Sequence, residues 1–186
     1  RSMGRVAVMA TCSAEVALTE AGLLNDPCIT DGRMGVAYGS CNGSTEATIN
    51  FAKMYTDNST RSMTATTYVE MMSHTCAVNI GLFFGLQGRI IPTASACTSG
   101  SQGVGYAYEA IKFGQQTLMA AGGAEELCAA DSAVFDTLFA ASLKNDTPEL
   151  TPRPFDAGRD GLVIGEGAGT LILEDLEHAQ ARGAKI

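Results

Sequence analysis

The sequence predicts an α/β fold in which a mostly parallel sheet is packed between helices. Three observations support this class: apolar segments of strand length alternate with segments of helical period, 46% of the residues are hydrophobic, and only 17% are charged. Such alternation favours a parallel sheet, because each helix carries the chain back to the start of the next strand. No repeat, linker or low-complexity tract interrupts the pattern, so we expect one α/β unit over the 186 residues.

The expected strands and helices follow one another in chain order. The strands share short apolar runs and are expected at 33–40, 90–94, 116–126 and 168–175. The helices share apolar residues three or four positions apart and are expected at 3–21, 45–55, 68–84, after Cys97, 131–141 and 176–182. Met9, Cys12 and Val16 are expected on one face of the first helix, and the strand at 90–94 is expected to be buried. The closing residues 182–186 indicate the start of a further strand.

The charge and hydropathy of the chain argue against two classes of partner. The formal net charge is −8 and no basic stripe is present, which argues against general nucleic-acid binding. No apolar stretch reaches the roughly 20 uncharged residues of a bilayer span, and no signal peptide opens the chain, so no membrane partner is expected. An acidic partner would have to dock on a local patch, for which the available cations are Arg1, Arg5, Lys53 and Arg61.

The cysteines do not form a metal-binding or disulfide pattern. They include no C-x-x-C pair and lie at positions 12, 28, 41, 76, 97 and 128. Free thiols indicate a reducing compartment, so we expect a cytoplasmic protein without a bound metal. The segment GEGAGT at 165–170 does not complete G-x-G-x-x-G, so no nucleotide cofactor is expected either.

Cys97 lies where a short apolar run gives way to a helical pattern. Its neighbours in TASACTSGSQG are small, so a substrate could approach the sulfur. At a strand-to-helix junction the N–H groups of the first helical turn favour a thiolate, and they could also hold the oxyanion of a thioester under attack. This arrangement is suited to acyl transfer through an S-acyl enzyme. The alternative is that Cys97 is an inert, small apolar side chain.

A second candidate nucleophile is Cys41, in the segment GSCNG. This segment fits G-x-C-x-G, a cysteine version of the hydrolase nucleophile elbow, although a glycine-rich turn explains it equally well. Such a nucleophile would need a histidine. His74 falls in an apolar helix and His178 on a charged helix that is expected to face solvent, so neither is well placed. The segment GGAEE at 122–126 could bring carboxylates to a site, or could be a tight turn that ends in solvated acids.

Taken in order, these segments resemble the β-ketoacyl-acyl-carrier-protein synthases, the elongating condensing enzymes of the thiolase-like superfamily. The resemblance covers essentially the whole chain and has features of both fatty-acid types I and II. It rests on the ordered segments VAYGSCNGS, NIGLFFGLQG, TASACTSGSQGVGYAYEAIKFG, AAGGAEE, ASLKNDTPELTPRPFDAGRDG, VIGEGAG and LEHAQARGAKI.

The resemblance implies a role for Cys97 and for its partners. Cys97 would accept an acyl chain from acyl carrier protein, and its backbone N–H would supply one oxyanion donor. A carbanion from malonyl-acyl carrier protein would then attack the Cys97 thioester and release a 3-oxoacyl product. Met71, Met72 and Phe83 would line the acyl pocket. The strand before Cys97 would pair with its mate in a homodimer, and no cofactor is implied.

The chain departs from the family pattern in three ways. The catalytic histidines and lysine of the family lie in His-Gly-Thr and Lys-x-x-x-Gly-His motifs, which are absent here, and His74 and His178 do not match them. Leu162 stands where the family usually has a phenylalanine near the cysteine, so we also expect it at the acyl pocket. We further expect residues 1–186 to be part of the N-terminal half of a duplicated thiolase-like fold, without its opening strand and the C-terminal half.

Three hypotheses follow for the function. The first is a 3-oxoacyl-acyl-carrier-protein synthase of fatty-acid elongation, with Cys97 as the nucleophile. The second is a non-catalytic partner subunit of the chain-length-factor type, which the retained cysteine disfavours. The third is a cysteine hydrolase that uses Cys41. Selective labelling and substitution of Cys97 and Cys41 would distinguish them.

Overall fold

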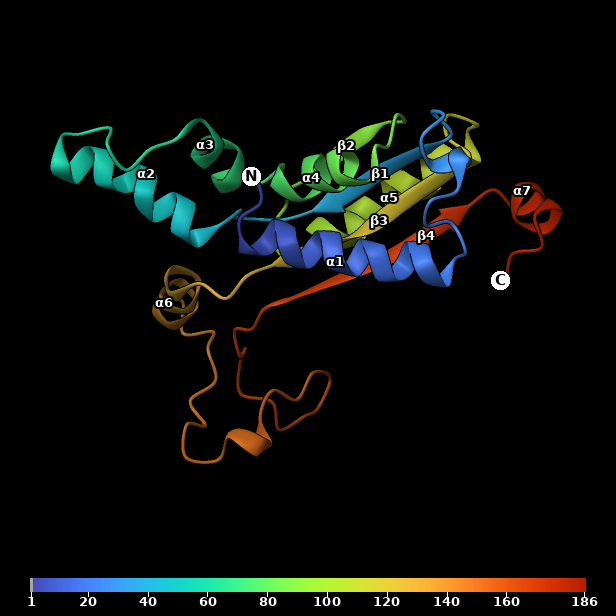
Figure 1. The fold of residues 1–186 in the computed structure, drawn as a ribbon. Helices are drawn as coiled ribbons and strands as arrows, with labels where there is room; N and C mark the ends of the chain where they lie inside the picture. Colours follow the sequence, from blue (N-terminus) through green and yellow to red (C-terminus); the bar gives the residue numbers. More distant parts are fainter. Residues whose placement is uncertain (1) are drawn as a thin grey trace. The chain divides into compact units, whose positions relative to one another are not determined.

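A four-stranded mixed sheet forms the centre of the protein (Figure 1). The structure is a computed structural model that describes residues 2–186. The strands lie in the order β2-β1-β3-β4; their bounds are Met34–Gly39 for β1, Ile90–Thr93 for β2, Leu118–Glu125 for β3 and Gly167–Glu174 for β4. β1 is parallel to β2 and β3, whereas β4 is antiparallel to β3. The expected α/β class with a mostly parallel or mixed sheet is therefore confirmed.

Helices cover both faces of this sheet. α1 (Arg5–Glu20) and α4 (Thr75–Phe84) pack on one face, and α5 (Ser99–Lys112) packs on the other (Figure 1). Side chains alternate along each strand, so Val36 and Tyr38 lie in the core with α1 and α4, while Ala37 lies in the core with α5. The α5 face is built mainly from alanine, which lets that helix lie close to the sheet.

The buried face of α1 differs from the expected one. The core side consists of Val6, Ala10, Ala14 and Leu18, all fully buried. Cys12 and Val16, expected together with Met9 on the apolar face, are exposed instead. The helix packs against β4, and the Ser13 and Thr170 hydroxyls form a hydrogen bond of 2.9 Å between the two elements. The outer face carries the exposed valines Val8 and Val16.

The expected helix at 68–84 is two helices. α3 (Ala65–Met71) begins earlier, at a capping box in which Thr64 and Thr67 exchange hydrogen bonds between side chain and backbone. Met72 then takes an extended conformation with ψ of 147°, which ends α3. α4 begins after His74 and ends at Gly85, whose φ of 67° is left-handed. His74 therefore lies just before a helix rather than inside one.

The other elements agree with expectation except at some ends. α2 spans Thr45–Asp57, and α7 spans Leu176–Ala181. α6 spans Ala129–Thr137 and stops short of the expected end, while residues 182–186 form no strand. β2 is partly exposed rather than buried, with Ile90 at 41% exposure. Short 3-10 turns occur at Pro27–Ile29 and Pro148–Leu150.

Residues Glu126–Glu166 form a second compact unit, separate from the unit built on the sheet. It contains α6, the 3-10 turn at Pro148–Leu150 and a bridge between Ala141 and Leu162. The sequence pattern predicted one unit with a long loop here, because this stretch has few apolar residues with a regular period. Among residues 2–186, no helix has the length and apolar character needed to cross a membrane.

Candidate active site

Cys97 lies in the turn that connects β2 to α5, at the carboxyl end of the parallel strands. Its side chain is exposed. The preceding residue, Ala96, has φ of 50°, in the left-handed region that residues with a Cβ rarely adopt. α5 begins two residues later, at Ser99. The sequence therefore folds locally into a tight turn that presents the Cys97 thiol at a strand-to-helix junction, as expected.

The backbone N–H groups around Cys97 are not all free. The Thr98 N–H donates to the Ser95 carbonyl at 3.2 Å, and the Ser99 N–H donates to the Ala96 carbonyl at 3.1 Å. These two donors of the first helical turn are therefore not available to a substrate, contrary to expectation. Within residues 2–186 no group accepts a hydrogen bond from the N–H of Cys97 itself. That group can donate to an oxyanion that forms beside its own sulfur.

Glycines set the distance between α5 and the sheet beneath Cys97. A Cβ at Gly39, the last residue of β1, would lie 2.4 Å from the carbonyl carbon of Ser99. A Cβ at Gly103 would lie 2.8 Å from the carbonyl oxygen of Ala37, so a second turn of the helix also lies against strand backbone. The start of α5 thus rests on backbone atoms of the sheet, which fixes the height of Cys97 above the strand ends.

Cys41 lies in the loop after β1 and is also exposed. Its N–H donates to a carboxylate oxygen of Glu125 at 2.6 Å, and the N–H of Asn42 donates to the other oxygen at 3.4 Å. A backbone N–H held by a carboxylate cannot stabilise a developing oxyanion at Cys41. The GGAEE segment does not form the tight turn of the second alternative: residues 122–125 belong to β3, and Glu125 accepts hydrogen bonds from the loop after β1.

Among residues 2–186, neither histidine forms a hydrogen bond with a cysteine. His178 contacts Glu174 at 2.5 Å and accepts a hydrogen bond from Arg33 at 3.1 Å. Because a guanidinium only donates, the His178 Nε2 is an acceptor and Nδ1 carries the proton shared with Glu174. Arg33 lies just before β1, at the opposite end of that strand from Cys41, about 20 Å away at the usual rise per residue. His178 is thus partly buried in an ion-pair cluster rather than facing solvent, and His74 has no hydrogen bond with Cys41 among the described residues.

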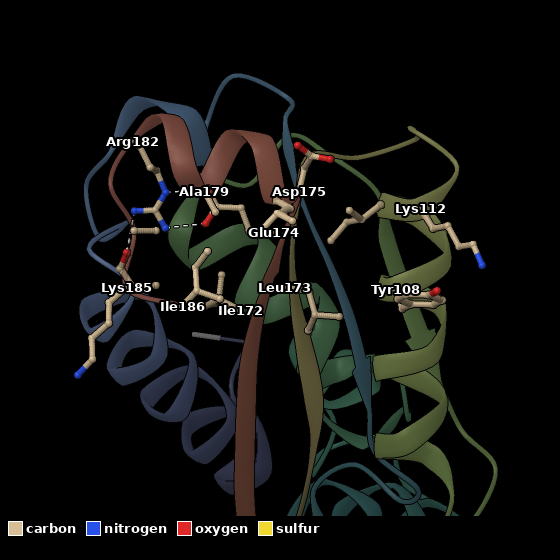
Figure 2. Close-up of a pocket in the computed structure, with 14 residues that line it drawn as sticks. Tyr108, Lys112, Ile172, Leu173, Glu174, Asp175, Ala179, Arg182, Lys185 and Ile186 are labelled. Carbon is tan, nitrogen blue, oxygen red and sulfur yellow. Dashed lines mark hydrogen bonds and ion pairs between the residues drawn. The ribbon is translucent and has the colours of Figure 1, made fainter.

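A cavity of about 570 Å³ lies at the far end of α5 from Cys97 (Figure 2). Tyr108 and Lys112 of α5 line one side, and the carboxyl end of β4 lies beside them. Glu174 and Arg182 at its rim already form a bidentate pair at 2.7 and 2.6 Å. Burial acts to raise the pKa of Glu174, but the hydrogen bonds from Arg182 and His178 outweigh it and hold that pKa below its usual value. The pair is a structural link between β4 and α7.

Groups that could hold a metal are not found in the part of the chain that the structure describes. No three histidine, cysteine, aspartate or glutamate side chains within residues 2–186 are grouped for this purpose.

Comparison with known proteins identifies the family. The model of the β-ketoacyl synthase N-terminal domain matches residues 1–179. The chain belongs to the β-ketoacyl synthase family. A crystal structure of a β-ketoacyl synthase from Burkholderia phymatum STM815 is 60% identical, with a TM-score of 0.96, and the match covers 100% of this chain and 45% of that one.

Two further relatives match the whole of this chain but only part of their own length. The 3-oxoacyl-acyl-carrier-protein synthase 1 of Escherichia coli K12 is 35% identical over 100% of this β-ketoacyl synthase chain and 46% of its own length. The structure titled the ishigamide ketosynthase/chain length factor is 27% identical with a TM-score of 0.86, over 100% of this chain and 45% of that one. The chain thus spans about half the length of these relatives. The thiolase-like fold expected from the motifs is confirmed.

Three of the residues expected at the acyl pocket of a β-ketoacyl synthase lie in the sheet unit, at two different places. Met71 ends α3 beside the loop after β1, since a Cβ at Gly43 would lie 2.5 Å from its carbonyl oxygen. Met72 follows directly. Phe83 is 59% exposed and lines a different cavity, of about 500 Å³, with Pro27 and other residues that precede β1. The structure therefore separates Phe83 from Met71 and Met72, because α4 runs away from the carboxyl edge of the sheet.

Leu162 belongs to the second compact unit and is 48% exposed. Its backbone exchanges hydrogen bonds of 2.8 Å with Ala140 and Ser142. It lines a cavity of about 590 Å³ in that unit together with Arg153 and Arg159.

Two residues hold the loops of the candidate site; the sequence singled out the GGAEE segment that contains the first, Glu125, but not the second, Ser99. Glu125 holds the loop after β1, and Ser99 holds the turn before Cys97 through its side chain. A carboxylate at the end of a buried strand was a signal for the first. Within TASACTSGSQG, residue type alone does not distinguish Ser99 from the neighbouring serines and threonines.

Proposed function

We propose that this chain carries the nucleophile of a 3-oxoacyl-acyl-carrier-protein synthase, with Cys97 as the residue that accepts the acyl chain. The observation that carries the proposal is the exposed Cys97 thiol beside its own backbone N–H, which has no acceptor among residues 2–186. Family membership and a relative named for the same reaction support it.

The first half-reaction uses only groups at this turn. The thiolate of Cys97 attacks the carbonyl carbon of the acyl thioester, and the Cys97 N–H donates to the oxyanion of the tetrahedral intermediate. When the intermediate collapses, the bond to the carrier sulfur breaks and the carrier leaves as a thiolate, which takes up a proton from water. The acyl group is then held as a thioester on Cys97.

The second half-reaction is decarboxylative condensation with malonyl-acyl carrier protein. Carbon dioxide leaves the malonyl group, and the resulting carbanion attacks the Cys97 thioester. The new carbon–carbon bond releases the 3-oxoacyl product and regenerates the Cys97 thiolate. The histidine and lysine motifs of the family are absent from these 186 residues, so we expect this chain alone to perform acylation but not condensation.

Acylation of this chain by a small acyl thioester tests the proposal. Wild-type protein incubated with an octanoyl thioester of N-acetylcysteamine should gain one octanoyl group on the peptide that contains Cys97, measured by mass spectrometry. Cys97→Ala should lose the modification, and Cys41→Ser should keep it. Acyl uptake by the Cys97→Ala protein would refute the assignment of the nucleophile. Ester turnover that depends on Cys41 would support the hydrolase instead, which the contact between Glu125 and the Cys41 N–H disfavours.

A non-catalytic partner subunit is the second candidate, since one structural relative is titled a ketosynthase/chain length factor. The retained cysteine argues against it. Iodoacetamide labelling separates the two: a synthase should have one cysteine, Cys97, that reacts far faster than the other five. Equal rates at the exposed residues Cys12, Cys41 and Cys97 would favour the inert subunit.

The partners, site and location proposed for the whole protein follow from the same assignment. Acyl carrier protein is the proposed donor, and a cytoplasmic location is proposed with it. β2 is at one edge of the sheet, and we propose that this edge pairs with a second copy in a homodimer. Met71, Met72, Phe83 and Leu162 stay predictions for the acyl pocket, and no contact among the described residues tests them. Sedimentation of the complete protein tests the homodimer.

A further inference from the structure

Ala96, the residue before Cys97, has a left-handed backbone although it is not glycine. A side chain with a Cβ adopts this conformation rarely, so interactions around it must hold it in place. The direction in which the chain enters Cys97 depends on this residue. If Ala96 relaxed to a right-handed or extended conformation, the thiol and N–H of Cys97 would point elsewhere.

The side chain of Ser99 bonds to both sides of Ala96. Its hydroxyl donates to the Ala96 carbonyl at 2.7 Å and accepts from the Ser95 N–H at 2.8 Å. Ser99 is only 5% exposed, so water cannot replace these bonds when the hydroxyl is removed. One buried hydroxyl thus spans the left-handed residue.

Ser99 is itself fixed to the sheet. Its carbonyl accepts a buried hydrogen bond of 2.7 Å from the Thr93 hydroxyl, at the end of β2. The same carbonyl lies over Gly39 at the end of β1, where no Cβ could fit. Ser99 therefore connects the rigid ends of two strands to the turn that carries Cys97.

The neighbouring hydroxyls differ from Ser99 in exposure. Thr98 donates to the Ser95 carbonyl at 2.8 Å, and Ser101 donates to the Thr98 carbonyl at 3.0 Å, but both residues are exposed. Water can take over either bond. Ser101 also makes no contact across Ala96, which makes it a matched control on the same helical turn.

We infer that Ser99 is a positioning residue for Cys97: its buried hydroxyl holds Ala96 in the left-handed conformation and thereby sets the direction of the Cys97 thiol and N–H. This inference rests on the proposed function in so far as it concerns acyl transfer. The hydroxyl itself does not touch the acyl group and takes part in no proton transfer.

The experiment is a double-mutant cycle on Ser99 and Ala96, read out at Cys97. Alkylation by iodoacetamide is followed residue by residue by mass spectrometry over the pH range of thiol ionisation, with Cys12 as an internal reference. Ser99→Ala should slow alkylation of Cys97 about tenfold, the effect of one lost hydrogen bond on a barrier, and leave Cys12 unchanged. Ala96→Gly should restore the rate in the Ser99→Ala background, because glycine adopts a positive φ without a steric penalty.

The outcomes are distinct for the inference and for the proposed function. A wild-type rate at Cys97 in Ser99→Ala, an equal loss in Ser101→Ala, or no rescue by Ala96→Gly would each overturn the positioning role. If Ser99→Ala alone fails to fold, the double variant should fold and react normally, and its failure to do so would also overturn the role. Failure of the wild-type protein to take up an octanoyl group would refute the proposed function, while the alkylation rates would still decide the role of Ser99.

Discussion

The contact between Gly39 and α5 predicts the effect of adding one methyl group. In Gly39→Ala, the new Cβ would lie 2.4 Å from the Ser99 carbonyl carbon and 2.8 Å from the Gly100 nitrogen, whereas ordinary contact begins at 3.4 Å. The start of α5 must therefore move by about 1 Å, the difference between contact and overlap. Backbone atoms cannot turn aside as a flexible side chain would.

The displacement should affect both stability and acylation. Overpacking of this kind costs about 1–3 kcal/mol, which lowers the melting temperature of a chain of this size by about 2–12 °C. A misplacement of about 1 Å in a reacting group can slow a reaction about 100-fold. Gly39→Ala should therefore slow octanoyl transfer to Cys97 by about that factor.

Thermal unfolding followed by circular dichroism and acylation followed by mass spectrometry measure the two effects. Gly105→Ala is the matched control on α5, because a Cβ there meets nothing within 4 Å. The control should keep the acylation rate and gain about 0.5–1 kcal/mol from better helix propensity. If Gly39→Ala melts and acylates like wild type, the start of α5 is not held by this backbone contact and the argument fails.

Three further predictions concern the rest of the sheet unit. The lowered pKa of Glu174 contributes stability above pH 4.5 that is lost as the pH falls through the folded-state value; Glu174→Gln should remove this loss in an acid titration of the unfolding free energy. Burial raises the pKa of Tyr38 to about 12 from 10.0, so stability should fall as the pH rises between these values, and Tyr38→Phe should abolish the fall. Glu125→Ala should lower the unfolding free energy by about 1 kcal/mol in urea, since it leaves the Cys41 N–H without its carboxylate.

The sequence was sufficient to predict the strands and most helices, because period and glycine positions are local signals. The sequence-based prediction failed where the local structure depends on tertiary packing. The buried face of α1 was misassigned because Val16 is apolar, whereas it is 58% exposed and the small residues Ala10 and Ala14 are fully buried. The break at Met72 was missed although the polar residues Ser73 and His74 follow it and the capping box at Thr64 was available as a signal for the start of α3.

The candidate site was predictable in part. Cys97 stands out from its small neighbours and from its place between a strand and a helix. The state of each N–H around it depends on the turn geometry, which residue types alone do not specify. For the same reason the sequence could not assign a role to Ser99, or show that Phe83 lies on a part of α4 remote from Met71.

The close packing of α5 against the backbone of the sheet also has a consequence for protein engineering. Where the meeting surfaces are glycine and peptide groups, the placement of the helix does not depend on how larger side chains elsewhere interlock. A designer could therefore exchange Leu18 or Ile80 in the opposite layer for residues of similar volume and expect the reactive turn to stay in register. Such substitutions should be tolerated at most positions of that layer. They should not be tolerated at Gly39 and Gly103, where α5 contacts the backbone of the sheet.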